Sequence, residues 1–253
     1  MQYREQTIGM MSEVAPSVRK RVSEVITKAL RLAENYRGRG DAFAFDLYPE
    51  LDEKINKLLI ALSDGLLKDA EKRARNVLDL FDMVLDEESI IQDAEEGEKG
   101  IVWALDMHCS NLKKVIAAWI AVGFANGWDT GKILNNCLVY MSNPDASLYW
   151  REAVRTKVVD PNEVQFGRGY QRNVIDAVTV TEQGLIYRSF LIASQWVGEI
   201  DGATHYVIHR GSTFDCPLCD ERCGVPIPID VPYVPTHIRC VCQLEFVTLD
   251  EEE

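Results

Sequence analysis

The sequence predicts a mainly α-helical protein, in which an N-terminal helical region is followed by a small α+β module built on a zinc knuckle. Apolar residues recur at helical spacing through most of residues 18–197, and five of the seven cysteines fall after residue 215. A chain of 253 residues with 47% hydrophobic content can build one or two domains with a substantial core. We therefore predict a helical region over residues 1–160 and a C-terminal module over residues 161–253.

The first predicted helix follows Ser17, which we interpret as its N-cap, and Gly38 and Gly40 are expected to end it. Its apolar positions are Val18, Val22, Val25, Ile26, Ala29 and Leu32. Residues 1–40 carry eight bases and four acids, so this end of the chain is more basic than the rest.

A second helix of nearly thirty residues is predicted to start at about Pro49, a residue suited to a first helical turn. Gly65 costs about 1 kcal/mol inside it, so the pattern is compatible with a kink or a break there. A stripe of this length indicates packing against a partner helix, from this chain or from another. The stripe consists of Leu51, Ile55, Leu58, Leu62, Leu66, Ala70, Val77 and Phe81.

Residues 82–98 contain eight acids and no base, which is typical of a solvated loop or an exposed helix face. Another apolar pattern then predicts a helix over residues 99–126. Within it, His108 and Cys109 are interpreted as core packing, because no second metal ligand lies three or four residues further on. Shorter helices are predicted over residues 129–141 and 145–158, with a break at Asn143-Pro144.

The C-terminal module is predicted to open with a helix over residues 174–197, which Gly198 and Gly202 end. A strand is predicted over residues 205–209 and another over residues 241–247. Between the strands lie two cysteine-containing segments joined by a proline-rich link.

These two segments have the spacing of a metal site. The first is a C-x2-C pair, the second is H-x2-C-x-C, and 17 residues separate them. Such pairs can converge on one tetrahedral zinc. We predict zinc ligands at Cys216, Cys219, His237 and Cys240, with Cys242 as the alternative fourth ligand. Four protein ligands close the coordination shell, which favours a structural zinc over a catalytic one; disulfides or free thiols are the alternatives.

The charge of the chain limits the kinds of partner that it is expected to bind. The net charge is −13, and from residue 200 onward ten acids face three bases, so direct binding to nucleic acid is disfavoured. The chain opens without the apolar segment of a secretory signal, and its most apolar run, residues 115–125, is about half the length needed to span a bilayer. We therefore expect no membrane association and a reducing compartment.

The C-terminal pattern resembles the Mu-F-like minor head proteins of tailed bacteriophages over about residues 170–248. The matching residues are Thr181-Glu182, Asp215, Cys216-Pro217-Leu218-Cys219, Gly224, Pro235, His237, Cys240 and Cys242. The family usually has Arg before the Thr-Glu pair, where this chain has Val180. The resemblance implies a component of the virion near the portal, which acts in head morphogenesis or genome delivery.

We therefore expect a non-enzymatic, portal-associated minor head protein, stabilised by a structural zinc and assembled in the host cytoplasm. Its expected partners are phage portal or capsid proteins, contacted mainly through the helical region, which could also support self-association. Two alternatives are a zinc-dependent enzyme of nuclease or deaminase type, which needs an open metal site, and a cellular helical adaptor with a zinc knuckle.

Overall fold

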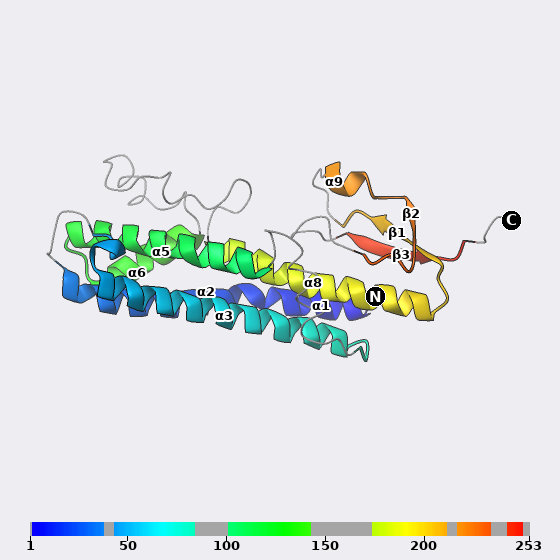
Figure 1. Cartoon of the computed structure of the whole chain (residues 1–253), viewed down its shortest axis with the longest axis horizontal. Helices are drawn as coiled ribbons and strands as arrows, with labels where there is room; N and C mark the ends of the chain where they lie inside the picture. The colour runs from blue at the N-terminus through cyan, green and yellow to red at the C-terminus, as the bar shows by residue number, and fades with distance from the viewer. Residues whose placement is uncertain are drawn as a thin grey trace. The chain divides into compact units, whose positions relative to one another are not determined.

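The computed structural model of the chain describes residues 2–37, 43–83, 101–142, 174–211, 217–233 and 242–249. Over these residues the fold is mainly α, with a three-stranded sheet near the C-terminus (Figure 1), which confirms the predicted class. Of the described helices, none combines the length and the hydropathy needed to cross a bilayer. The predicted helix over residues 145–158, the division near residue 160 and most of the acidic stretch 82–98 lie outside the described residues.

The chain forms two compact units, and neither is one continuous stretch. The first, which we call the helical unit, comprises Val14–Leu67 and Glu98–Thr179. The second, which we call the composite unit, comprises Met1–Glu13, Lys68–Gly97 and Val180–Glu253. Helices α3 (Pro49–Asp79) and α8 (Val174–Ile200) contribute residues to both. The composite unit thus joins segments from both ends and the middle of the chain.

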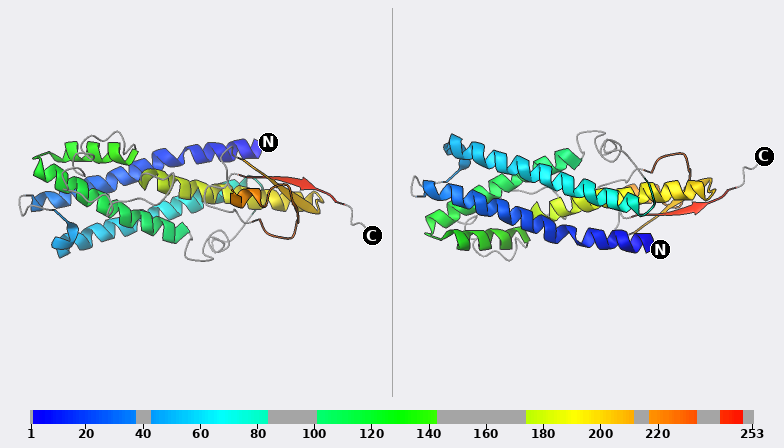
Figure 2. Two further views of the ribbon diagram at one scale, coloured as in Figure 1. Left: turned by 90° about the horizontal axis from the view of Figure 1, so that it is seen from above. Right: turned by 90° about the horizontal axis from the view of Figure 1, so that it is seen from below.

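The helical unit contains α2 (Val14–Ala33), the first part of α3, α5 (Ile101–Ala125) and α6 (Thr130–Ser142). Short 3-10 helices η1 (Glu34–Tyr36) and η2 (Phe45–Leu47) lie between α2 and α3. Helices α5 and α6 pack against each other and against α2 (Figure 2). The positions of α3, α5 and α6 confirm the predicted helices to within about two residues at each compared end.

The chain is helical from its first described residues, which the sequence pattern did not predict. Helix α1 (Gln2–Ser12) precedes α2, and a turn at Glu13 separates them. Ser17 therefore lies inside α2, and its interpretation as an N-cap is wrong. The buried face of α2 begins at Val14, which is as fully buried as Val18, so the helix starts one turn earlier than expected.

The apolar stripe of α3 is largely buried within this chain. Its fully or nearly fully buried members are Leu51, Ile55, Leu62, Leu66, Ala70 and Val77. The helix also passes through Gly65 without a break, and a Cβ there would lie 2.9 Å from Nη1 of Arg21. Glycine at this position leaves room for the guanidinium on α2.

Polar contacts fix α3 against α5 inside the helical unit. Lys113 Nζ lies 2.6 Å from Asp52 Oδ1, and Ser63 Oγ donates a hydrogen bond to Asp106 Oδ1 at 2.8 Å. His108 and Cys109 are buried beside these contacts, which confirms their interpretation as core residues. Burial lowers the pKa of His108 to about 4 and, with Asp106, raises the pKa of Cys109 to about 12.

The sheet belongs to the composite unit. Its central strand β1 (His205–His209) pairs antiparallel with β2 (Pro226–Pro228) and with β3 (Gln243–Val247). Strands β1 and β3 confirm the two predicted strands, whereas β2 lies in the proline-rich link and was not predicted. The short helix α9 (Pro217–Asp220) includes Cys219 of the first cysteine segment. Figure 1 places the sheet and α9 beside the C-terminal half of α8.

Helix α8 continues through Gly198 to Ile200, so the predicted helix end at Gly198 is wrong. A Cβ at Gly198 would lie 2.8 Å from Cε1 of Phe246 and closer still to other atoms of that ring. Glycine is therefore needed there for close approach of β3. Gly202, with φ of 85°, makes the turn that ends the helix, as predicted.

Candidate functional site

Tyrosines and cysteines form a buried cluster between α8, α9 and the sheet, which we call the module core. Tyr187 and Leu191 are four residues apart on α8 and share one helix face, while Tyr206 and Ile208 alternate along β1 and share one sheet face. The module core consists of Tyr187, Leu191, Tyr206, Ile208, Cys219, Tyr233 and Cys242. Local periodicity therefore explains why the two α8 residues share a face and why the two β1 residues share a face, and tertiary packing brings the seven side chains together.

The predicted ligands divide into two groups. Cys216, His237 and Cys240 lie outside the described residues. Cys219 and Cys242 are 3% and 5% exposed and lie in the module core. The structure thus brings together two of the cysteines that the spacing predicted would converge.

The predicted structural zinc is wrong on what the structure describes. Within the described residues, no group of three or more His, Cys, Asp or Glu side chains is placed to hold a metal ion, and a zinc knuckle is not supported. The side chains that surround the two described cysteines are mainly apolar or aromatic. Cys219 and Cys242 share the module core with tyrosine and aliphatic side chains, where a thiol behaves as a small apolar group.

Cys223 lies at the turn after α9. Its N–H donates to the carbonyl of Cys219 at 3.0 Å, and its side chain is partly buried against the module core. Gly224 follows with φ of 77°, and its N–H donates to the carbonyl of Ile208 at 3.0 Å. The turn that leads from α9 to β2 therefore needs glycine at residue 224.

Gln195 of α8 holds the segment that follows β2. Its Nε2 donates to the carbonyls of Ile229 and Val231 at 2.7 and 2.8 Å, and its Oε1 accepts the N–H of Tyr233 at 2.9 Å. One amide side chain thus satisfies three backbone groups of an irregular segment. The sequence offered no signal for this contact, because a glutamine on a helix is usually a surface residue.

Two tyrosines place phenol groups inside the module core. Tyr187 donates a hydrogen bond to the carbonyl of Cys242 at 3.3 Å. Burial raises the pKa of Tyr206, and the nearby Arg222 partly opposes that shift. Arg222 also lies over the ring of Tyr233, with its guanidinium carbon 5.5 Å from the centroid. These contacts stabilise the packing of the core.

A buried ion pair involves Glu182 of the Thr181-Glu182 pair on α8. Glu182 is fully buried, Thr181 is 1% exposed, and Arg73 Nη1 of α3 lies 2.8 Å from Glu182 Oε2. Burial of a carboxylate is costly unless a cation and hydrogen bonds compensate it, so Arg73 is the partner that this position needs. Sequence reasoning marked Glu182 but missed Arg73, which is 109 residues away. The sequence signal for such a pair is a charged residue within the apolar pattern of a helix, because a buried charge needs a partner of opposite sign.

A scan against protein-family models and searches of curated proteins and of solved structures found no match for this chain. The resemblance to Mu-F-like minor head proteins therefore rests on the motif residues alone. Of these, Thr181, Glu182, Pro217, Leu218, Cys219, Gly224 and Cys242 are among the described residues. Thr181, Glu182, Cys219 and Cys242 are buried, Pro217 is exposed, and Gly224 makes a left-handed turn.

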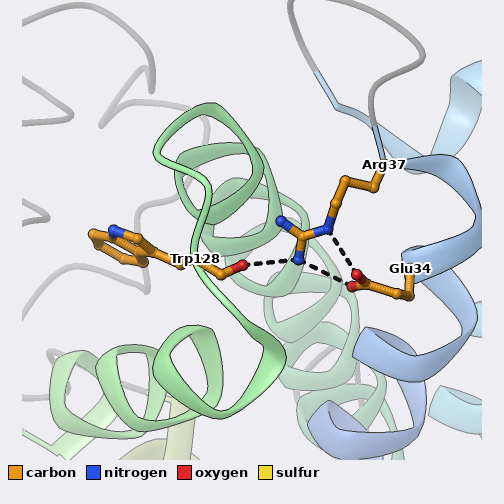
Figure 3. A network of polar contacts seen from close by, with 3 residues as sticks. All are labelled: Glu34, Arg37 and Trp128. Carbon is orange, nitrogen blue, oxygen red and sulfur yellow. Dashed lines mark hydrogen bonds and ion pairs between the residues drawn. The ribbon is translucent and has the colours of Figure 1, made fainter.

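A second polar network joins the end of α2 to the turn between α5 and α6 (Figure 3). Arg37 Nε and Nη2 donate to the two carboxylate oxygens of Glu34 at 2.7 and 3.0 Å, and Nη2 also donates to the carbonyl of Trp128 at 2.8 Å. The guanidinium carbon lies 4.4 Å from the ring centroid of Phe124. Through these contacts Arg37 connects η1 to the turn between α5 and α6 within the helical unit.

Two ion pairs of the composite unit are partly or largely exposed. His209 Nε2 lies 2.6 Å from Glu245 Oε2, with side chains 51% and 60% exposed. Arg210 Nη1 lies 2.6 Å from Asp220 Oδ1. Such pairs add little to stability. The described site therefore consists of a packed core, with hydrogen bonds and ion pairs that connect its helices and strands.

Proposed function

We propose that this chain is a minor head protein of a tailed bacteriophage, a non-enzymatic assembly component that binds portal or capsid proteins. In this proposal it is made in the host cytoplasm and becomes part of the virion near the portal, where it acts in head morphogenesis or genome delivery. The proposal rests on the resemblance of residues 170–248 and on the positions that the described motif residues occupy.

The observation that best supports the proposal is the burial of Thr181 and Glu182. A carboxylate that works as a general acid or base has to reach a substrate proton. Glu182 is fully buried and ion-paired with Arg73, so it is occupied as a framework residue. Cys219 and Cys242 are likewise packed in the module core. The described motif residues named here therefore have structural positions and are not exposed to a substrate. This is what we expect of a protein that acts by binding other proteins.

We place the main contact with portal or capsid protein on the helical unit. The stripe of α3 no longer argues for an outside partner, since most of it is buried within the chain. Trp103 of α5 is a better anchor, since its side chain is 50% exposed. Tryptophan is enriched among the residues that carry most of the binding energy of interfaces.

The test uses the full chain, because a cut near residue 160 would separate Arg73 from Glu182 and remove α8 from the composite unit. The cognate portal protein is titrated against wild type, Trp103→Ala and Trp196→Ala. Trp196 is the matched control, an exposed tryptophan of α8 in the composite unit, 38% exposed. We expect Trp103→Ala to weaken binding at least tenfold and Trp196→Ala to leave it unchanged.

Other outcomes would contradict the proposal. Loss of portal binding only in Trp196→Ala would move the contact to the composite unit. Failure of the wild-type chain to bind portal or capsid protein, or tight salt-sensitive binding to duplex DNA, would overturn the assignment itself. A gene located beside a portal or terminase gene would support it over a cellular adaptor.

A further inference from the structure

The two edges of the sheet differ in the backbone groups that they present. Successive residues of a strand direct their N–H and C=O groups to opposite sides. The carbonyl of Thr204 accepts the N–H of Ile229 at 2.9 Å, and the carbonyl of Ile208 accepts the N–H of Gly224 at 3.0 Å. The even-numbered residues of β1 therefore face β2, and the odd-numbered residues face β3.

The outer edge of β2 lacks donors. In this strand Ile227 pairs with Tyr206 of β1, so the neighbouring residues Pro226 and Pro228 direct their backbone groups outwards. Proline has no backbone N–H and cannot donate to an added strand. Both outward positions of β2 are thus blocked, which is a common way of protecting an exposed edge from pairing.

The outer edge of β3 keeps its donors. Gln243, Glu245 and Val247 pair with the odd-numbered residues of β1, which leaves Leu244 and Phe246 directing their N–H and C=O groups outwards. Within the described residues, β3 pairs with β1 alone. This edge carries no proline, so it can accept another strand by backbone hydrogen bonding.

Side chains beside the β3 edge define what such a strand would carry. Leu249, which follows β3, is 42% exposed, and its N–H donates a hydrogen bond to Oγ1 of Thr204 at 2.9 Å. On the solvent face the side chain of Glu245 is 60% exposed, with its Oε2 2.6 Å from Nε2 of His209, and it places a carboxylate on this edge strand. The edge therefore combines apolar surface with negative charge.

The geometry points to the outer edge of β3 as a docking site for an extended segment of another protein, in which apolar and basic side chains alternate. Residues opposite each other on neighbouring strands lie on the same face of the sheet. The apolar side chains of the added segment would continue the face of Leu244 and Phe246, and its basic side chains would lie beside Glu245. The inference rests on the sheet alone and does not depend on the proposed function.

The test uses a fluorescently labelled heptapeptide of alternating valine and lysine, titrated into the full chain and followed by anisotropy. Leu244→Pro and Leu244→Ala form a matched pair, because both remove the leucine side chain and only proline removes the outward N–H. We expect Leu244→Pro to bind the peptide at least tenfold more weakly than Leu244→Ala. A peptide with glutamate in place of lysine should also bind at least tenfold more weakly.

Amide hydrogen exchange of the unmodified chain provides a second readout, which decides the matter if Leu244→Pro does not fold. Saturation with the valine-lysine peptide should slow exchange at Leu244 and Phe246 and leave Glu245 unchanged. Equal peptide affinity of two folded variants, or no protection of these two amides, overturns the proposal. Dimerisation of the peptide-free chain that Leu244→Pro abolishes also overturns it, because a second copy would then occupy the edge. Since the probe is synthetic, these outcomes are independent of portal binding.

Discussion

Arg73 of α3 and Glu182 of α8 form an ion pair in the composite unit, with 2.8 Å between Nη1 and Oε2. The Glu182 side chain is 1% exposed and that of Arg73 17%, so the carboxylate depends on this cation. The pair joins two helices that are far apart in the sequence and lies at the Thr-Glu step by which the chain resembles minor head proteins. Its role in this fold is to make α8 a fixed support for the module core.

Arg73→Met is expected to lower the free energy of unfolding by about 3 kcal/mol, because it leaves the buried Glu182 without its cation. The double variant Arg73→Met/Glu182→Leu should recover most of that loss, since both charges are then gone. Urea unfolding of the three proteins measures this. Lys72→Met, an exposed neighbour on α3, is the control and should change stability by less than about 0.5 kcal/mol. No recovery in the double variant would contradict this account.

Gly198→Ala is expected to destabilise the composite unit by about 1–3 kcal/mol, because its Cβ would collide with the ring of Phe246. Gly9→Ala is the matched control. Gly9 is also helical and has open space around it, so alanine there should raise stability by up to about 1 kcal/mol. Thermal melts of both variants compare the two signs. Equal stabilisation by both substitutions would show that β3 does not approach α8 this closely.

Gln195→Glu should be more destabilising than its small chemical change suggests. The carboxylate still accepts the N–H of Tyr233, but it cannot donate to the carbonyls of Ile229 and Val231 and is repelled by them. We expect a loss of about 1–3 kcal/mol in urea unfolding. Ser194→Ala removes one local hydrogen bond from the same turn of α8 and serves as the control, with a smaller expected loss. A neutral effect of Gln195→Glu would contradict the clamp.

Stability should fall with acidification because of His108. Burial lowers its pKa from 6.5 to about 4, so between these values the unfolded chain binds a proton that the folded chain does not. The contribution of His108 is therefore fully present above pH 6.5 and is lost as the pH falls towards 4. The shift corresponds to about 3 kcal/mol.

Urea unfolding at several pH values between 7 and 4, compared between wild type and His108→Gln, isolates this contribution. Glutamine is polar and does not titrate, so the slope of stability against pH should be smaller in the variant over this window. Parallel slopes would show that His108 is not held neutral by burial.

Much of the local structure could be predicted because helices and strands follow the period of the apolar residues. The stripe of α3, the spans of α5 and α6, and strands β1 and β3 all came from patterns that a few neighbouring residues define. Cys219 and Cys242, which were predicted as zinc ligands, lie together in one buried core. The predicted zinc did not follow, because the pattern could not tell a thiolate ligand from a small buried apolar side chain.

What the sequence by itself determined is the helical class, the strands of the cysteine-containing module and the acidity of the C-terminal part. Only the tertiary structure decided that α8 passes through Gly198, that Gln195 holds the segment after β2, and that Glu182 is matched by Arg73. Each of these depends on residues distant in the chain, and periodicity carries no information about which distant residue fills a space or satisfies a charge. The composite unit has the same origin, since its stability comes from packing between the two ends and the middle of the chain.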